Sequence, residues 1–230
     1  DAPLHWDGEY FGRALERRVW LNHGVGQFAR PLQQPHPPIA MAMVGPGGRT
    51  AETIAERDMI PISANFVPIE NVVAQWRDYA LAKEHSGKVA DRHVWRVCRN
   101  ILITQTDEEA AELLSDPDGV IAHYFRYIRG VRRIEEFQSL QHEALPVINE
   151  FLEVPDALRD CAIVGSADTV LARLVDLVDQ LGPFGTLVMV GHDWDDSGLS
   201  QSSMQCLAEN IMPQLKKYVD SLGPARWFGL

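Results

Sequence analysis

Short apolar runs alternate with segments of helical spacing from residue 39 onward, and this alternation constrains the fold more than any other feature. The runs are residues 39–44, 60–63, 94–104, 162–165 and 186–190. Strands that alternate with helices form parallel βαβ units with right-handed crossovers. Residues 39–44 are apolar throughout, which predicts a strand covered on both faces. With about four such units, the pattern predicts an α/β fold, either an open doubly wound sheet or half of an eight-stranded barrel.

The segments between the runs carry helix signals. Residues 50–57, 72–83 and 204–222 have the spacing or flanking residues of helices, and so does the segment from Ser166 to its end at Gly182-Pro183. In the pattern Thr106-Asp107-Glu108-Glu109, the threonine oxygen can accept from an early N–H while Glu109 reaches back to the cap. Ser166 is a good N-cap, and Pro213 is expected to kink the last helix. Residues 119–158 exceed a normal barrel connection, so we predict a helical insertion or lid there.

The first 38 residues are rich in glycine, proline and aromatic residues. Asp7-Gly8 predicts a hairpin turn flanked by aromatic strand residues. Residues 31–38 (PLQQPHPP) favour an extended surface connection, because prolines lack N–H donors and restrict their neighbours. We therefore interpret residues 1–230 as a single partial domain in which residues 1–38 form a connecting loop and hairpin. The chain starts without an initiator Met, so we expect it to begin inside a larger unit.

Charge and cysteine content exclude several classes of protein. A net charge of −11 and a pI near 5.1 argue against a partner that is a nucleic acid or an anionic membrane. The three cysteines lie far apart without metal-ligand spacing, which favours reduced thiols and a cytoplasmic location. No apolar run approaches the roughly 20 residues that a spanning helix needs. These features are typical of an acidic cytoplasmic enzyme.

A glycine-rich turn after the first run is the clearest candidate for anion binding. Gly45, Gly47 and Gly48 precede a predicted helix, and Arg49 and Thr50 add a positive charge and a hydroxyl donor. Backbone N–H groups at such a turn, together with the helix dipole, can bind a phosphate. The turn matches neither the dinucleotide nor the P-loop fingerprint. Phosphate binding and a tight turn that only caps the helix both remain open.

A second candidate site lies where predicted strands end. His192-Asp193 follows the last strand, and Asn65-Phe66 follows the second. Parallel α/β folds place their functional loops at this end of the strands, so we predict that these four residues line a substrate pocket. A solvated acidic loop is the alternative for His192 and Asp193. No second histidine has metal-ligand spacing and no nucleophile motif is present, so neither a metal nor a catalytic residue is assigned.

Six segments, in this order and spacing, resemble the second half of bacterial-luciferase-like flavin-dependent monooxygenases, near the limonene and alkane types. They are WDGEYF at residues 6–11, PLQQPHPPI at 31–39, GPGGRT at 45–50, IPISANF at 60–66, VGS at 164–166 and GHDW at 191–194. The final Met212-Pro213-Gln214-Leu215 also resembles that family's last helix. The run QQPHPP is the most specific of these segments.

The resemblance implies the C-terminal half of a TIM-type (β/α)8 barrel that uses reduced FMN, supplied by a separate flavin reductase. Its reaction would insert one atom of O2 into a small organic substrate, with the flavin carrying the chemistry. By the same resemblance, Gly45, Gly47, Gly48, Arg49 and Thr50 would hold the flavin phosphate. Family members often carry a serine where Gly48 stands, so the backbone must bind more of the phosphate in this chain.

Two other functions remain open. A deazaflavin-dependent dehydrogenase would keep the fold and change the cofactor. A non-catalytic paralogue that binds a ligand or serves as a dimer partner would agree with the missing serine. A half-barrel exposes two edge strands and apolar inner positions, so we expect a homodimer or a complementary N-terminal half as partner.

Overall fold

The computed structural model describes residues 4–7, 12–15, 32–45, 47–140, 154–192 and 197–229, and the chain divides into two compact units after Pro38. In the first unit, β1 (Leu4–Asp7) pairs antiparallel with β2 (Gly12–Leu15). Asp7 lies opposite Gly12, so a hairpin follows Asp7, but its connection is longer than a two-residue turn. Tyr10 and Phe11, expected beside the turn, lie outside the described residues.

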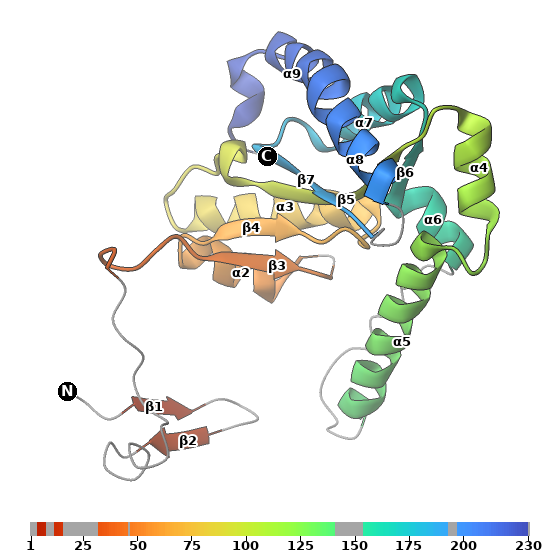
Figure 1. The fold of residues 1–230 in the computed structure, drawn as a ribbon. Helices are drawn as coiled ribbons and strands as arrows, with labels where there is room; N and C mark the ends of the chain where they lie inside the picture. Colours follow the sequence, from red (N-terminus) through yellow and green to blue (C-terminus); the bar gives the residue numbers. More distant parts are fainter. Residues whose placement is uncertain are drawn as a thin grey trace. The chain divides into compact units, whose positions relative to one another are not determined.

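The second unit is built around a parallel sheet of five strands (Figure 1). They are β3 (Ala40–Met43), β4 (Ile60–Ser63), β5 (Arg96–Ile103), β6 (Ala162–Gly165) and β7 (Thr186–Val190). The order β3-β4-β5 follows the chain, whereas β5 pairs with both β6 and β7. Asn100 lies opposite Val190 of β7 and Ala162 of β6, so β5 changes partner at this residue. The predicted parallel α/β architecture is confirmed.

Helical segments connect each strand of this sheet to the next and complete the unit after β7. They are α2 (Arg49–Glu56), α3 (Ile69–His85), η2 (Arg92–Val94), α4 (Asp107–Ser115), α5 (Val120–Leu140), α6 (Val154–Cys161), α7 (Ala167–Leu181), α8 (Ser197–Cys206), η3 (Leu207–Ile211), α9 (Met212–Ser221) and η4 (Pro224–Trp227). Helix α5 extends away from the sheet (Figure 1), whereas α2, α3 and α7 contribute buried residues to one core. None of the described helices is long and apolar enough to cross a membrane.

The core of the sheet centres on Trp95, whose side chain is fully buried. Its ring stacks on Trp76 of α3 with centroids 4.8 Å apart, and its Nε1–H donates to the Ser63 hydroxyl at 3.0 Å. Arg92 lies over the Trp76 ring and donates to the carbonyl of Leu181, the last residue of α7. These contacts tie β4, β5, α3 and the end of α7 together.

The first predicted strand is less buried than the sequence indicates. Ala40, Met41 and Ala42 are exposed, and only Met43 of β3 is buried. Within the described part of the chain β3 pairs only with β4, so it is an edge strand. Because three of its four side chains are exposed among the described residues, the expectation that both faces are covered is wrong for this part of the chain. An apolar run indicates what a strand can bury, and not which segments cover it.

The helix signals are largely confirmed, with two differences. The Thr106 hydroxyl accepts from Glu109 N–H at 3.2 Å, but the Glu109 carboxylate accepts from Gln105 N–H and not from Thr106 N–H. The last helical stretch begins earlier than predicted and contains the π-helical segment η3 just before Pro213. A proline lacks the N–H for the preceding turn and its ring crowds that turn's carbonyl, which accounts for the widened turn.

Candidate functional site

Three polar side chains from distant parts of the chain meet beside the sheet. The Asn65 Nδ2 donates to Asn100 Oδ1 at 2.5 Å, and the His192 Nε2 lies 2.5 Å from the same oxygen. Asn65 follows β4, Asn100 lies in β5, and His192 follows β7. The structure therefore brings together two of the residues that the sequence predicts for a substrate pocket, and Asn100 is the link between them.

Tyr124 of α5 completes this polar cluster. Its hydroxyl accepts from Asn65 Nδ2 at 2.8 Å and donates to Asn65 Oδ1 at 3.1 Å. The Tyr124 and His192 rings are 4.1 Å apart. Neither Tyr124 nor Asn100 is among the site residues predicted from the sequence. The sequence contains a signal for Asn100, because an amide in the middle of a predicted strand needs a hydrogen-bond partner when it is buried. No local pattern could have selected Tyr124, because its position depends on how α5 packs.

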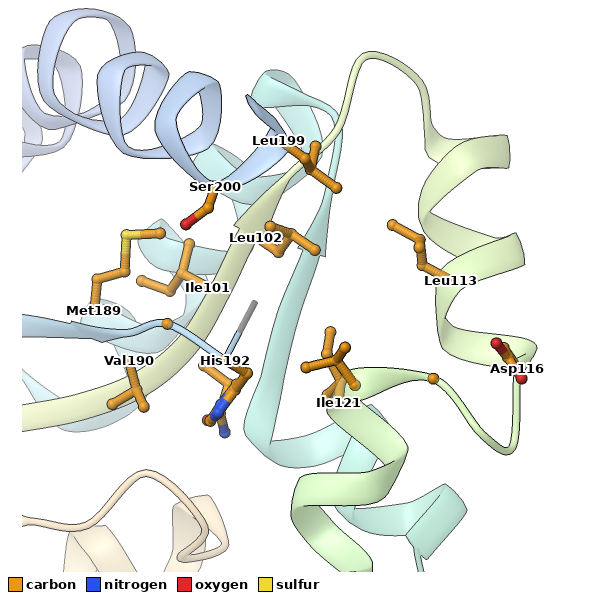
Figure 2. A pocket seen from close by; sticks show the side chains of 14 residues that line it. Ile101, Leu102, Leu113, Asp116, Ile121, Met189, Val190, His192, Leu199 and Ser200 are labelled. Carbon is orange, nitrogen blue, oxygen red and sulfur yellow. The ribbon is translucent and has the colours of Figure 1, made fainter. Parts of the chain in front are cut away.

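A cavity of about 90 Å³ adjoins the cluster (Figure 2). Its wall is mostly apolar and comes from β5, β7 and the helices α4, α5 and α8. The lining side chains labelled in Figure 2 are Ile101, Leu102, Leu113, Asp116, Ile121, Met189, Val190, His192, Leu199 and Ser200. An apolar cavity with a few polar groups at one side is the usual form of a small-molecule site.

Burial lowers the pKa of His192 from its ordinary value of 6.5. The unfolded chain therefore binds a proton at this residue at a higher pH than the folded protein does. His192 therefore contributes to the free energy of unfolding when its side chain is neutral. The contribution is fully present above about pH 6.5 and is lost as the pH falls through the lower, folded-state pKa.

We expect His192→Gln to weaken the acid dependence of stability. Glutamine has no ionisable group but can still donate a hydrogen bond toward Asn100. The check is urea unfolding at pH 7.5 and pH 5.5 for both proteins, compared as the change in free energy of unfolding between the two pH values. An equal change in the variant would contradict the lowered pKa of the half-buried His192.

The glycine-rich turn is held against α3. The Gly45 carbonyl accepts from Gln75 Nε2 at 2.5 Å, and Gly48 N–H donates to the Asp78 carboxylate at 3.0 Å. Gly47 has a φ of 113°, and a Cβ at this position would collide with the same carboxylate. Arg49 and Thr50 are exposed at the start of α2, which has no side-chain cap.

Gly48 takes backbone angles that other residues rarely adopt. Its φ is 67° and its ψ is −141°. Glycine reaches such angles without the strain of about 1–3 kcal/mol that a side chain would incur. This conformation gives a physical reason why a serine does not occupy the position.

The remaining predicted residues are placed as follows. Phe66 is partly buried and packs against both core clusters, whereas Asp193 lies outside the described residues. Arg99 of β5, which is not among the predicted site residues, is also buried: its Nη1 donates to the Cys98 carbonyl at 3.0 Å, and its Nη2 has no hydrogen-bond partner among the described residues. Burial lowers the pKa of Arg99.

The parallel sheet with connecting helices makes this chain an α/β protein. Comparisons with known proteins narrow this class further. No protein-family model matches the sequence. The 3,6-diketocamphane 1,6-monooxygenase of Pseudomonas putida is 25% identical over 215 residues, covering 92% of this chain and 55% of that relative.

Solved structures share the fold. The oxygenating constituent of 3,6-diketocamphane monooxygenase from P. putida, a type II Baeyer-Villiger monooxygenase in complex with FMN, superposes with a TM-score of 0.62 at 23% identity. That match covers 93% of this chain and 58% of the other. The monooxygenase RslO1 from Streptomyces bottropensis gives a TM-score of 0.56 at 20% identity, covering 93% of this chain and 56% of the other.

In sequence and fold, this chain is similar to luciferase-like FMN-dependent monooxygenases. It spans about half the length of the relatives that it matches.

Proposed function

We propose that this protein is a monooxygenase that uses reduced FMN and O2 to insert one oxygen atom into a small organic substrate. The observation that carries the proposal is the Asn65–Asn100–Tyr124–His192 cluster beside an apolar cavity, in a chain of this family. The polar groups orient a substrate, and the apolar wall limits the access of water. Bound reduced FMN supplies the activation of oxygen.

The glycine-rich turn would hold the phosphate of FMN. The start of α2 has no side-chain cap, so its first N–H groups remain available for an anion, and Arg49 adds a positive charge beside them. Gly45, Gly47, Gly48 and Thr50 complete the turn. The Asp78 carboxylate on Gly48 N–H opposes this role, because phosphate would have to bind beside a negative charge or displace it. The uncapped helix start and Arg49 support phosphate binding at this turn, and the Asp78 carboxylate competes with the phosphate for Gly48 N–H.

The partners follow from the same proposal. The P. putida relative is the oxygenating constituent of its monooxygenase. We expect a separate flavin reductase to supply reduced FMN to this protein as well. The exposed apolar residues of β3, together with Ile39 and Val44, favour pairing with a second copy or with the remaining half of a barrel.

The full-length protein is expected to bind FMN saturably, measured by quenching of flavin fluorescence and by calorimetry. With chemically reduced FMN and O2, it should then convert a small hydroxyl-bearing cyclic ketone into a product heavier by one oxygen atom, which the same mixture without protein does not form. Riboflavin, which lacks the phosphate, is the matched control and should bind more weakly. Absence of FMN binding would reject the proposal, and hydride transfer with a deazaflavin without O2 consumption would favour the dehydrogenase alternative.

A further inference from the structure

The orientation of the Asn100 amide is fixed by two backbone carbonyls. Its Nδ2 donates to the Asn65 carbonyl at 3.0 Å and to the Cys161 carbonyl at 2.9 Å. These bonds use both hydrogens of the amide nitrogen. Rotating the amide by half a turn would set its oxygen against two carbonyl oxygens, so only one orientation is compatible with the surroundings.

With this orientation, the Asn100 oxygen can only accept. It receives one hydrogen from Asn65 Nδ2, whose other hydrogen bond goes to the Tyr124 hydroxyl. The His192 Nε2 lies 2.5 Å from the same oxygen. An amide oxygen carries no hydrogen, so the hydrogen of this bond must belong to Nε2.

The other ring nitrogen of His192 is then the open position. A neutral imidazole with hydrogen on Nε2 has a lone pair on Nδ1. Among the described residues, Nδ1 has no hydrogen-bond partner. His192 and Asn100 both line the cavity, whose wall is otherwise mostly apolar.

We infer that Asn100 is a positioning residue that holds His192 with its hydrogen on Nε2, so that His192 Nδ1 accepts a hydrogen bond from an O–H or N–H group of the ligand in the cavity. The hydrogen bond from a ligand to His192 Nδ1 rests on the proposed function, whereas the tautomer of His192 is a property of the protein alone. The cavity volume of about 90 Å³ exceeds the roughly 10–15 Å³ that one water requires, so a small organic molecule can enter.

A purely structural cluster would behave differently. If the amides and the imidazole only held β4, β5 and α5 together, replacing any of them would lower stability. The state of the His192 ring nitrogens would then not depend on whether a ligand carries a hydrogen-bond donor. Measurements that report on the two ring nitrogens of His192 therefore distinguish the two cases.

The first measurement is the two-bond ¹H–¹⁵N spectrum of protein labelled with ¹⁵N-histidine, recorded at pH 7.5, with His192→Gln identifying the His192 signals. We expect the pattern of a neutral ring with hydrogen on Nε2. Wild-type protein with hydrogen on Nδ1, or with both nitrogens protonated, would overturn the inference without any variant of Asn100.

The Asn100→Leu variant tests the cause. Leucine removes the acceptor, so the His192 signals should move toward a mixture of both tautomers. Asn100→Asp restores an acceptor and adds a negative charge, which should raise the pKa of His192 in the same spectra. Unchanged His192 signals in a folded Asn100→Leu protein would show that Asn100 does not set the tautomer.

The ligand step is tested with two probes of the same size, cyclopentanol and cyclopentanone, added without flavin. The alcohol has an O–H donor and should shift the Nδ1 signal of His192 saturably, whereas the ketone should leave it in place. Equal shifts with both probes, or none with either, would overturn the acceptor role. Neither result depends on FMN binding or oxygen consumption, so the proposed function stands or falls separately.

Discussion

Replacing Trp95 by alanine is expected to lower the free energy of unfolding by about 3–5 kcal/mol. The side chain is fully buried, stacks on Trp76 and donates to Ser63. The substitution removes this packing and leaves the buried Ser63 hydroxyl without its donor. Because domains are stable by only about 5–15 kcal/mol, the loss is a large fraction of the total.

Urea unfolding followed by far-ultraviolet circular dichroism measures this loss without relying on tryptophan fluorescence. Trp95→Phe keeps an aromatic ring but not the N–H donor, so it should lie between the wild type and alanine. Val89→Ala is the matched control, because this side chain is 72% exposed and its truncation should change stability by less than about 0.5 kcal/mol. A similar loss in both alanine variants would contradict the central place of Trp95 in the core.

Replacing Asp78 by asparagine is expected to strengthen FMN binding roughly tenfold, while riboflavin binding stays nearly unchanged. The Asp78 carboxylate accepts from Gly48 N–H at the turn where we place the phosphate. Two negative charges about 4 Å apart repel by roughly 1 to 4 kcal/mol, depending on how much water surrounds them. Arg77, 3.2 Å from the same carboxylate, offsets part of this repulsion.

The measurement is the ratio of the FMN and riboflavin dissociation constants for wild type and Asp78→Asn. Glu84→Gln, on the same helix α3, makes the same change in net charge with an exposed side chain and should leave the ratio unchanged. If Asp78→Asn leaves the ratio at its wild-type value, the phosphate does not bind beside Gly48. FMN binding itself would still be measured in that case, so the location of the phosphate and the use of FMN are tested separately.

The site shows where local sequence patterns stop being informative. Asn65 and His192 were placed at the same end of the sheet because parallel strands share a direction. Asn100 and Tyr124 were missed, although they contribute most of the hydrogen bonds that hold the cluster. Their roles depend on contacts between distant segments, which periodicity does not encode.

The sequence by itself determined the parallel strands, most of the helices and the caps at Thr106 and Ser166, because these depend on residues within a few positions of one another. The tertiary structure decided the rest. Pairing of β5 with β7 brings His192 to Asn100, and packing of α5 brings Tyr124 to Asn65. It also decided that β3 lies at an edge and that a carboxylate from α3 reaches Gly48. Each of these contacts joins segments far apart in the chain, so its position depends on the packing of the whole unit.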